Sequence, residues 1–392
     1  MKKVLVLNSG SSSLKYQLFN VDGDRYDAVA KGIAERIGGE GANITLKIGD
    51  NKQTKMVDMP THTEAFQEVM NFLLSGPLKS VDELSAVGHR VLHGGEIFKD
   101  SVKITPDSLQ KMESLTPLGP LHMPANISGI RAVQELLPNV PQVAVFDTVF
   151  HQSMKKEAFM YALPLEYYTD YQIRRYGFHG ISHAYVSQEA AKLIGKKGKI
   201  ITCHLGNGAS LAAVDNGKCV DTTMGFTPLA GIIMGTRSGD IDPFIALYLQ
   251  KLLNKSADDV NTILNKQSGM FGICGYSDNR DVETRFENGD EKCVLAMNMY
   301  VHSIVRFIGS YIAVLGGVDA IVFTAGVGEN GSILRRLVVE KLSYLGIKLD
   351  VENNKKRGQT VEISTPDSKV KVFVIPTNEE LMIAQDTMRL AF

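Results

Sequence analysis

The chain has few cysteines and almost no net charge. Four cysteines occur among 392 residues, and no two of them form a C-x-x-C pair. This density and spacing argue against a disulfide framework or a zinc knuckle and predict reduced thiols. The formal net charge is −1, from 42 basic and 43 acidic residues. A general nucleic-acid-binding protein would carry a basic excess, so that class is disfavoured.

Long hydrophobic runs are also missing. The N-terminal apolar run covers only residues 4–7, which is shorter than the roughly 7–15 residues of a signal-peptide core. The apolar stretch 307–326 is interrupted by Gly316, Gly317 and Asp319, so we expect a helix followed by a strand there rather than a membrane span. We therefore expect a soluble cytoplasmic protein, with two domains at roughly 100–200 residues each.

Short apolar runs alternate with amphipathic stretches, which is the pattern of an α/β protein. The helical spacing predicts helices over residues 63–74, 127–137, 182–193 and 333–345. The apolar runs predict strands at residues 4–7, 16–19, 86–92, 143–146, 200–204, 211–214, 320–324 and 370–375. The segment 154–171, rich in Tyr, Pro and Met, is the expected domain junction.

A small-residue turn recurs about half a chain apart. The strings LNSGSSSL at residues 7–14 and LGNGASL at residues 205–211 each follow one expected strand and lead into another. Two related halves of the chain would explain this repeat. Chance similarity between two Gly/Ser turns explains it as well.

The first of these turns, residues 8–13, predicts a phosphate site. Small residues let backbone N–H groups approach a ligand, and the serine hydroxyls add further donors. Lys15 supplies a nearby cation. A plain hairpin turn needs one glycine, not a run of Ser-Gly-Ser-Ser-Ser. No G-x-x-x-x-G-K-[ST] string occurs, so this is not a P-loop. The turn HLGNG at residues 204–208 is suited to a second phosphate.

A third glycine string, GVGENG at residues 326–331, matches G-x-G-x-x-G between an expected strand and an expected helix. Asp350 follows about twenty residues later, as in a dinucleotide fingerprint. Glu329 would place a carboxylate where a pyrophosphate sits, and little sequence follows for a complete dinucleotide fold. The string also fits adenosine or its phosphates at a helix N-terminus. NAD binding remains an alternative at this point.

Two H-x-x-x-H pairs, His89/His93 and His179/His183, have a spacing that zinc sites use, but neither contains the Glu of H-E-x-x-H. We interpret them as hydrogen-bond donors around an anion or as structural histidines. Zinc is disfavoured on this evidence.

Arginines and carboxylates give a sharper signal. Arg90 and Arg237 are each flanked by glycines and acidic residues, and guanidinium groups clamp carboxylate and phosphate oxygens. Two such arginines predict a small, doubly anionic reaction centre. Asp147 follows an expected strand directly, where α/β sites gather. Glu379 and Glu380 follow the last strand, and one carboxylate plus substrate phosphates is a typical Mg²⁺ arrangement.

Taken together, these strings resemble the acetate kinases, from residue 1 to residue 392. The resemblance rests on NSGSSSLK (8–15), HRVLHGGE (89–96), PLH (120–122), FDT (146–148), YGFHGISH (176–183), HLGNG (204–208), GTRSGDIDP (235–243), GVGEN (326–330) and NEE (378–380). It implies membership of the sugar kinase/Hsp70/actin superfamily, with two duplicated actin/hexokinase-like (ribonuclease H-like) α/β domains and a nucleotide cleft between them. The N-terminal domain would cover 1–150, completed by about 382–392, and the nucleotide-binding C-terminal domain 151–381.

The resemblance also implies roles for individual residues. Catalytic roles fall to Arg90, Asp147, His179 and Arg237. Substrate contacts fall to Arg90, Leu92, Leu121, Phe178 and Pro228. Asn8 and Glu379 would bind Mg²⁺, which Mn²⁺ can replace. Contacts to ATP or ADP fall to Ser11, Ser13, Lys15, His204, Leu205, Gly206, Asn207, Gly208, Asp278, Asn279, Arg280, Gly326, Val327, Gly328, Glu329 and Asn330. The third glycine string is thereby assigned to nucleotide rather than NAD.

The implied reaction is reversible, direct in-line transfer of a phosphoryl group from ATP to acetate, giving acetyl phosphate and ADP. Acetate is ionised at neutral pH because free carboxylates titrate near about 4, so no general base is needed. We therefore expect Asp147 to orient an arginine or a metal-bound water. Leu92 stands where the family commonly has Val, which predicts a preference for acetate over propionate.

Three alternatives remain on the sequence alone. They are a propionate kinase of the same family, an NAD-dependent oxidoreductase using GVGENG, and a non-catalytic nucleotide-binding member of the superfamily. The resemblance further implies a homodimer, with acetate and ATP as the small-molecule partners.

Overall fold

The computed structural model describes residues 1–392 and divides the chain into two compact units. Unit 1 comprises Met1–Val149 and Asn378–Phe392, and unit 2 comprises Phe150–Thr377. The chain therefore passes between the units after Val149 and again after Thr377. The segment 154–171 lies within unit 2.

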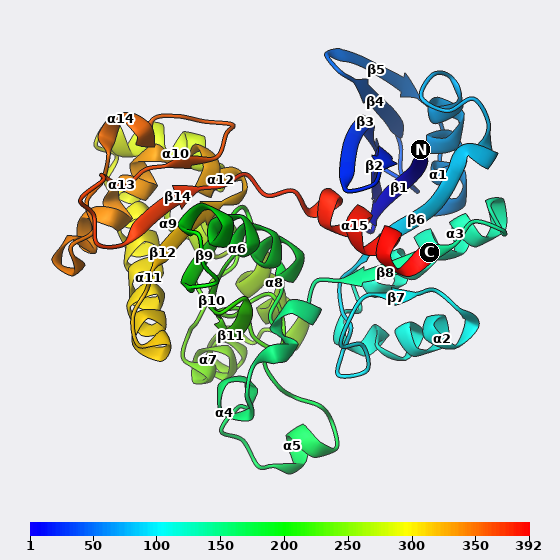
Figure 1. The fold of residues 1–392 in the computed structure, drawn as a ribbon. Helices are drawn as coiled ribbons and strands as arrows, with labels where there is room; N and C mark the ends of the chain where they lie inside the picture. Colours follow the sequence, from blue (N-terminus) through cyan, green and yellow to red (C-terminus); the bar gives the residue numbers. More distant parts are fainter. The chain divides into compact units, whose positions relative to one another are not determined.

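Unit 1 is built on an eight-stranded mixed sheet in the order β5-β4-β3-β2-β1-β6-β8-β7 (Figure 1). Strands β1 to β5 form an antiparallel meander, whereas β1, β6 and β8 run parallel to one another. The strands are β1 (Lys2–Ser9), β2 (Ser13–Asp22), β3 (Arg25–Glu35), β4 (Asn43–Ile48), β5 (Asn51–Met56), β6 (Leu84–Val91), β7 (Val102–Lys103) and β8 (Gln142–Phe146).

Helices cover the two faces of this sheet unequally. Helices α1 (His62–Leu74) and α3 (Met123–Leu136) pack on one face. On the other face, α15 (Glu379–Ala391) packs mainly against β1, β6, β7 and β8. The remaining helical segments are η1 (Val81–Glu83), α2 (Pro106–Ser114) and η2 (Thr116–Leu118). The face of β3 to β5 opposite α1 is therefore uncovered within unit 1.

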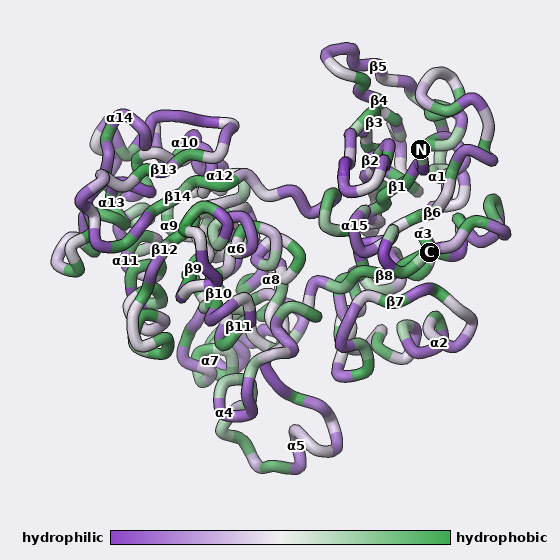
Figure 2. The backbone as a smooth tube through the Cα atoms, viewed as in Figure 1, coloured by the Kyte–Doolittle hydropathy of each residue, from purple (hydrophilic) through white to green (hydrophobic).

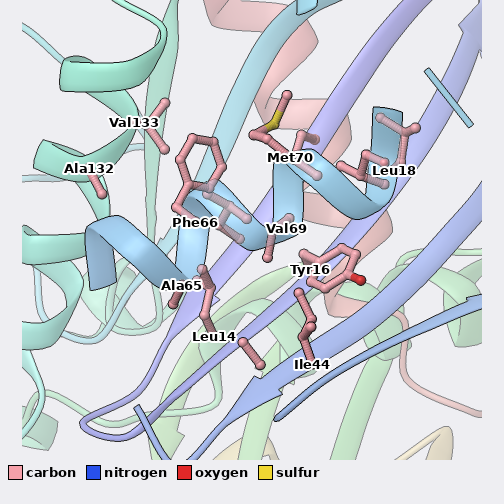
Figure 3. Packing of buried hydrophobic residues seen from close by; sticks show 14 of the residues in the cluster. Leu14, Tyr16, Leu18, Ile44, Ala65, Phe66, Val69, Met70, Ala132 and Val133 are labelled. Atoms are coloured by element: carbon pink, nitrogen blue, oxygen red, sulfur yellow. The ribbon is translucent and has the colours of Figure 1, made fainter. Parts of the chain in front are cut away.

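The core of unit 1 lies between α1, α3 and the sheet (Figure 3). Phe66 and Val69 of α1 pack over Leu14 of β2 and Ile44 of β4, and all four are almost fully buried. Each such side chain stabilises the fold by roughly 1.5–3 kcal/mol when removed from water. Because strand residues alternate between faces, this burial sends the neighbouring odd-numbered residues of β2 and β3 to the other face.

Unit 2 contains a six-stranded mixed sheet in the order β11-β10-β9-β12-β14-β13. The strands are β9 (Lys199–Leu205), β10 (Ala209–Asp215), β11 (Lys218–Thr222), β12 (Ala320–Thr324), β13 (Val361–Glu362) and β14 (Lys371–Val374). The helices are η3 (Val149–Ser153, which begins at the boundary), α4 (Lys156–Phe159), α5 (Glu166–Thr169), α6 (Gly180–Ile194), α7 (Pro243–Leu253), α8 (Ala257–Lys266), α9 (Gly269–Cys274), α10 (Asn279–Glu287), α11 (Glu291–Leu315), α12 (Ala325–Asn330), α13 (Ser332–Lys341), η4 (Ser343–Leu345) and α14 (Val351–Asn354).

The two sheets share one topology at their centres. In unit 1 the order β3-β2-β1-β6-β8 consists of an antiparallel meander followed by two parallel strands. In unit 2 the order β11-β10-β9-β12-β14 has the same directions. The two small-residue turns predicted from the sequence join the corresponding strands β1–β2 and β9–β10. This correspondence supports two related halves, and the α/β prediction is confirmed.

Helix α11 is long and apolar enough to cross a membrane by length and composition alone, a test that core helices of soluble proteins also pass. Its buried residues recur every three or four positions along one face, and they include Cys293, Met297, Tyr300, Ile304 and Ile308. This face packs against β9 and β10. The helix ends before β12 begins, so the predicted helix-then-strand over 307–326 is confirmed.

The buried histidines predict acid sensitivity. Burial lowers the pKa of His89, in unit 1, and of His151, in unit 2, to about 4. In the unfolded chain histidine titrates near about 6.5, so the unfolded state takes up protons first as the pH falls. Stability is therefore lost between those two values. Going from about pH 7 to about pH 5 should cost roughly 2 kcal/mol per histidine, measured by denaturant unfolding.

A matched variant separates these contributions. His89 bonds Gln142 at 2.8 Å and nothing charged. His89→Gln should therefore reduce the loss of unfolding free energy between about pH 7 and pH 5 by roughly 2 kcal/mol. This difference does not depend on how much the substitution changes stability at neutral pH. An unchanged pH dependence in that variant would contradict the assignment.

Candidate active site

Strand register places three of the predicted site residues in one row of unit 1, and a fourth, Asp147, follows the neighbouring strand. Lys15 of β2 lies opposite Asn8 of β1, and Asn8 lies opposite Arg90 of β6. Asp147 directly follows β8, and its backbone N–H donates to Val91 O at 3.1 Å. Since β1, β6 and β8 are parallel, their carboxyl ends meet at one edge of the sheet. The predicted position of Asp147 at the end of a strand is confirmed.

Arg90 is held by three neighbours in unit 1. Its Nε donates to Asp147 Oδ1 at 3.1 Å, and its Nη2 donates to Asp147 Oδ2. Its Nη1 donates to Asn8 Oδ1 at 3.3 Å, and Glu379 Oε2 lies 3.8 Å from its Nε. Burial lowers the pKa of Arg90, but the Asp147 and Glu379 carboxylates outweigh burial and raise it above its ordinary value. The guanidinium is therefore charged and fixed in orientation.

Glu379 lies in the first turn of α15, next to this arginine. Asn378 caps the helix by accepting a hydrogen bond from Leu381 N at 3.1 Å. Burial raises the pKa of Glu379 to about 7. Arg90 opposes this shift, while Asp147 and Glu380 add to it. Because burial and the neighbouring carboxylates disfavour the ionised form of Glu379, any further cation that approaches it would stabilise that form.

Asn8 and Glu379 fit a magnesium ion. Both contact the Arg90 guanidinium through oxygen atoms, so an amide oxygen and a carboxylate lie close together. Mg²⁺ prefers oxygen ligands and commonly takes only one or two carboxylates, completing its shell with water and substrate phosphates. Both residues line a cavity of about 340 Å³, together with Lys15 and Arg90.

In unit 2, His179 occupies a strained position at the start of α6. It is the N-cap residue and has φ of 56°, a left-handed conformation that non-glycine residues rarely adopt. Its ring stacks on His204 with centroids 4.0 Å apart. His204 Nδ1 in turn lies 2.8 Å from Ser182 Oγ.

A chain of hydroxyl groups links His179 to His183. Ser210 Oγ lies 2.8 Å from both His179 Nδ1 and His183 Nε2. His183 Nδ1 lies 2.7 Å from Thr202 Oγ1, whose hydroxyl faces Ala212 O at 3.4 Å. Burial lowers the pKa of His183 well below its usual value, so this ring is neutral. The sequence did not point to Ser210 or Thr202, because their role depends on tertiary contact.

The donor and acceptor capacity of each group assigns the protons along these hydrogen bonds. If Thr202 donates to Ala212 O, it accepts from His183 Nδ1, which leaves His183 Nε2 as an acceptor. Ser210 then donates to His183 and accepts from His179 Nδ1–H. Nε2 of His179 then carries no proton in the neutral ring.

Arg237 has no carboxylate partner. Its Nη1 donates to Pro228 O at 3.1 Å, and burial lowers the pKa of Arg237. A Cβ added to Gly208 would lie 3.3 Å from Arg237 Nη1 and 3.6 Å from His179 Nε2. The predicted stabilisers His179 and Arg237 therefore meet at the second glycine turn, where a side chain would crowd both.

A cavity of about 750 Å³ in unit 2 brings together the three segments predicted to contact nucleotide. This volume is within the usual range for ligand pockets, roughly 300–1,000 Å³. The predicted lining residues are Gly206, Asn207, Asp278, Asn279, Arg280, Gly326, Val327 and Asn330. Ser277, Glu283 and Arg357 also line this cavity and were not predicted from the sequence. Arg357 lies far along the chain from any motif, so only the fold reveals it.

The third glycine string differs from a dinucleotide loop. It forms the short helix α12 directly after β12, because Ala325 turns the chain with φ of 63°. Glu329 accepts from Thr377 N at 3.2 Å, and burial raises its pKa. Its carboxylate is thus occupied outside the cavity lining, which removes the conflict with a phosphate.

A buried arginine of α13 holds α12 in place through a hydrogen bond to its backbone. Arg335 is fully buried, and its Nη1 donates to Gly328 O at 2.8 Å while its Nε donates to Asn354 Oδ1 at 2.9 Å. Burial lowers the pKa of Arg335 to about 10. This side chain joins α12, α13 and α14 into one block beside the cavity.

The other predicted contacts are distributed between the units. In unit 1, Leu92 is half-buried, whereas Leu121 is 71% exposed. In unit 2, Phe178 and Leu205 are buried, and Pro228 acts through its carbonyl. Ser11, Ser13 and Lys15 lie at or beside the β1–β2 turn, whose Gly10 N–H donates to Ser13 O at 2.7 Å.

The histidine chain predicts a defined tautomer. When its imidazole is neutral, His179 should carry its proton on Nδ1, because Ser210 Oγ accepts a hydrogen bond there. Long-range ¹H–¹⁵N NMR of the imidazole nitrogens measures this directly. Ser210→Ala should shift His179 toward the Nε2–H tautomer, whereas Ser187→Ala, a buried serine elsewhere on α6, should leave it unchanged. A neutral His179 with Nε2–H in the unmodified protein would disprove the relay.

Comparison with known proteins identifies the family. A model of the acetokinase family matches residues 3–385. The acetate kinase of Thermotoga maritima is 53% identical, covering 99% of this chain and 98% of that protein. A crystal structure of Porphyromonas gingivalis acetate kinase has a TM-score of 0.95 at 45% identity, and a propionate kinase from Francisella tularensis 0.94 at 42%, each covering 100% of both chains. The chain belongs to the acetokinase family, whose members use ATP.

Proposed function

We propose that this protein transfers a phosphoryl group reversibly from ATP to acetate, giving acetyl phosphate and ADP. The observation that carries this proposal is the pairing of Arg237 with His179 at Gly208, in the unit that also holds the nucleotide-sized cavity. Arg237 has no carboxylate to neutralise it, so its charge is available to an incoming phosphate. The full-length similarity to acetate kinases supports the same reaction.

Direct transfer needs no general base in this mechanism. The acetate oxygen is already ionised, so catalysis rests on positioning and on stabilising charge. Asp147 is bonded to Arg90 through both carboxylate oxygens and acts as a positioning residue for that arginine. Arg90 binds the acetate carboxylate, and Arg237 stabilises the negative charge on the migrating phosphoryl group. His179 adds to this stabilisation in its doubly protonated form, because the ring with its single proton on Nδ1 has no donor at Nε2.

The nucleotide occupies the unit 2 cavity in this proposal. Gly206 and Gly208 leave the β9–β10 turn open to phosphate oxygens, and Arg280 and Arg357 add positive charge at the cavity wall. Asn8 and Glu379 would hold Mg²⁺, which would supply positive charge to neutralise the phosphates. All four cysteines are buried and free, consistent with a soluble enzyme of the reducing cytoplasm.

The reaction is tested with purified protein, ATP and Mg²⁺ in the hydroxamate assay, which traps the acyl phosphate. Acetate should give product, and propionate should give it with a lower kcat/KM, because the half-buried Leu92 narrows the acyl site. One methylene is worth roughly 1–3 kcal/mol of discrimination. Equal kcat/KM values would favour a propionate kinase. Reduction of NAD without acyl phosphate would overturn the proposal.

Arg237 and Asp147, the residue that positions Arg90, should respond differently to substitution. Removing a charge that stabilises the transition state costs on the order of 10²–10³ in kcat. Arg237→Ala should lose about this much kcat. Asp147→Asn keeps its size but weakens the hold on Arg90, so it should chiefly raise KM for acetate. Arg336→Ala, on an exposed helix face, is the matched arginine control. Full activity in Arg237→Ala would contradict the assignment.

The homodimer implied by the family has a candidate surface on α7. No residue of this helix is buried. Its large apolar side chains are therefore in water, and four of them are each more than half exposed: Phe244, Leu247, Tyr248 and Leu252. Monomeric proteins rarely leave such a continuous apolar strip in water. A second copy of this chain is the occupant we propose, since the same strip on both copies forms a self-complementary contact.

Leu247→Lys should weaken this dimer, because it places a charge in the apolar contact. Light scattering coupled to gel filtration would show a smaller mass across the micromolar range. Leu165→Lys, at the residue that precedes α5, is the control, since Leu165 is similarly exposed and lies outside α7. A monomeric unmodified protein, or equal loss in both variants, would refute the α7 interface.

A further inference from the structure

Three lysines stand side by side across the meander of unit 1. Gln17 of β2 lies opposite Lys31 of β3, Lys31 lies opposite Lys47 of β4, and Lys47 lies opposite Lys52 of β5. Because directly opposed residues point to the same face, the three ammonium groups form one row. We call Lys31, Lys47 and Lys52 the lysine row.

The lysine row is electrostatically unfavourable as it stands. Like charges directly opposite one another destabilise a sheet. None of the three lysines makes an ion pair or a side-chain hydrogen bond in the structure. By contrast, Lys55, on the other face of β5, pairs with Glu68 of α1 at 2.8 Å. The chain therefore neutralises its β5 lysine on one face and leaves the lysine row uncompensated on the other. In Figure 2, β5 is hydrophilic along most of its length.

The three lysines are exposed, and they also form part of the lining of a cavity. The cavity of about 340 Å³ that contains Asn8, Lys15 and Arg90 also includes all three lysines. Helix α15 packs mainly against β1, β6 and β8 on this face, and Glu379 and Glu380 in its first turn line the same cavity. The row is thus a basic extension of the candidate active site, leading away from Arg90 along the sheet.

We propose that the lysine row binds a condensed phosphate chain. Neighbouring strands are about 4.8 Å apart, so the row offers evenly spaced point charges along a line of about 10 Å. A linear polyanion matches this arrangement, whereas a compact carboxylate would be met better by the fork of an arginine. Inorganic tripolyphosphate and the phosphate chain of a nucleotide share this chemistry. The site lies outside the residues assigned to the phosphoryl transfer above.

The binding test compares two variants of the full-length protein by titration calorimetry with inorganic tripolyphosphate. The triple variant Lys31→Gln/Lys47→Gln/Lys52→Gln should bind at least tenfold more weakly than the unmodified protein. Lys55→Gln, which removes a lysine from the other face, should bind within twofold of it. Equal affinity in the triple variant, or equal weakening in Lys55→Gln, would overturn the proposal. Any binding left in the triple variant belongs to the other cations of the cavity, Lys15 and Arg90.

ATP distinguishes the two sources of the phosphate chain. If free polyphosphate is the ligand, the triple variant should keep the kcat and the KM for ATP of the unmodified protein while losing tripolyphosphate binding. A KM for ATP raised in parallel would identify the nucleotide's own phosphates as the ligand. Because binding is measured directly, an inactive enzyme that still binds tripolyphosphate through the row would reject the proposed reaction and keep this site.

Thermal stability gives an independent measurement. Lys47 is flanked by like charges on both sides, so Lys47→Gln should raise the melting temperature at low salt. Tripolyphosphate should raise the melting temperature of the unmodified protein more than sodium chloride of equal ionic strength does, and this excess should shrink in Lys47→Gln. An equal response to the two salts in the unmodified protein would overturn the proposal.

Discussion

Parallel pairing of the central strands decides where chemistry collects in each unit. Strands β1, β6 and β8 end at one edge, which brings Asn8, Arg90 and Asp147 together. Strands β9, β12 and β14 repeat this pairing in unit 2, where His204 lies opposite Thr324 and α12 begins immediately afterwards. Side chains from separate parts of the sequence become neighbours only because these strands share a direction.

The two units treat their arginines in opposite ways. In unit 1, carboxylates surround Arg90 and fix its plane, which favours recognition of a planar carboxylate. In unit 2, Arg237 rests on a neutral carbonyl and keeps its charge uncompensated. A phosphoryl group carries more charge than acetate, so the less neutralised cation suits it better. In the proposed reaction, this division lets a chain of near-zero net charge bind strongly anionic ligands.

The sequence predicted much of the fold and part of the candidate site. Apolar runs identified the buried strands, including β8 and Asp147 at its end, because a buried strand leaves a clear hydrophobic pattern. Strand β5 was missed because all its residues are exposed and no such pattern exists. The contact between Asp147 and Arg90 depends on strand register, and Ser210 and Arg357 depend on folding of the whole unit. These features leave no local signature in the sequence.

Arg335 has a consequence for how this chain can change over evolutionary time. Its guanidinium holds α12 and α14 together with several donors in one plane, in a space closed to water. Lysine has a single ammonium and could not serve both helices, and an apolar residue would leave their buried carbonyls unsatisfied. An exposed pair on the outer face of α13, Arg336 with Glu340, is free to vary, because solvent can replace either partner. Variation among relatives should therefore concentrate on that outer face, while the block around Arg335 stays constant.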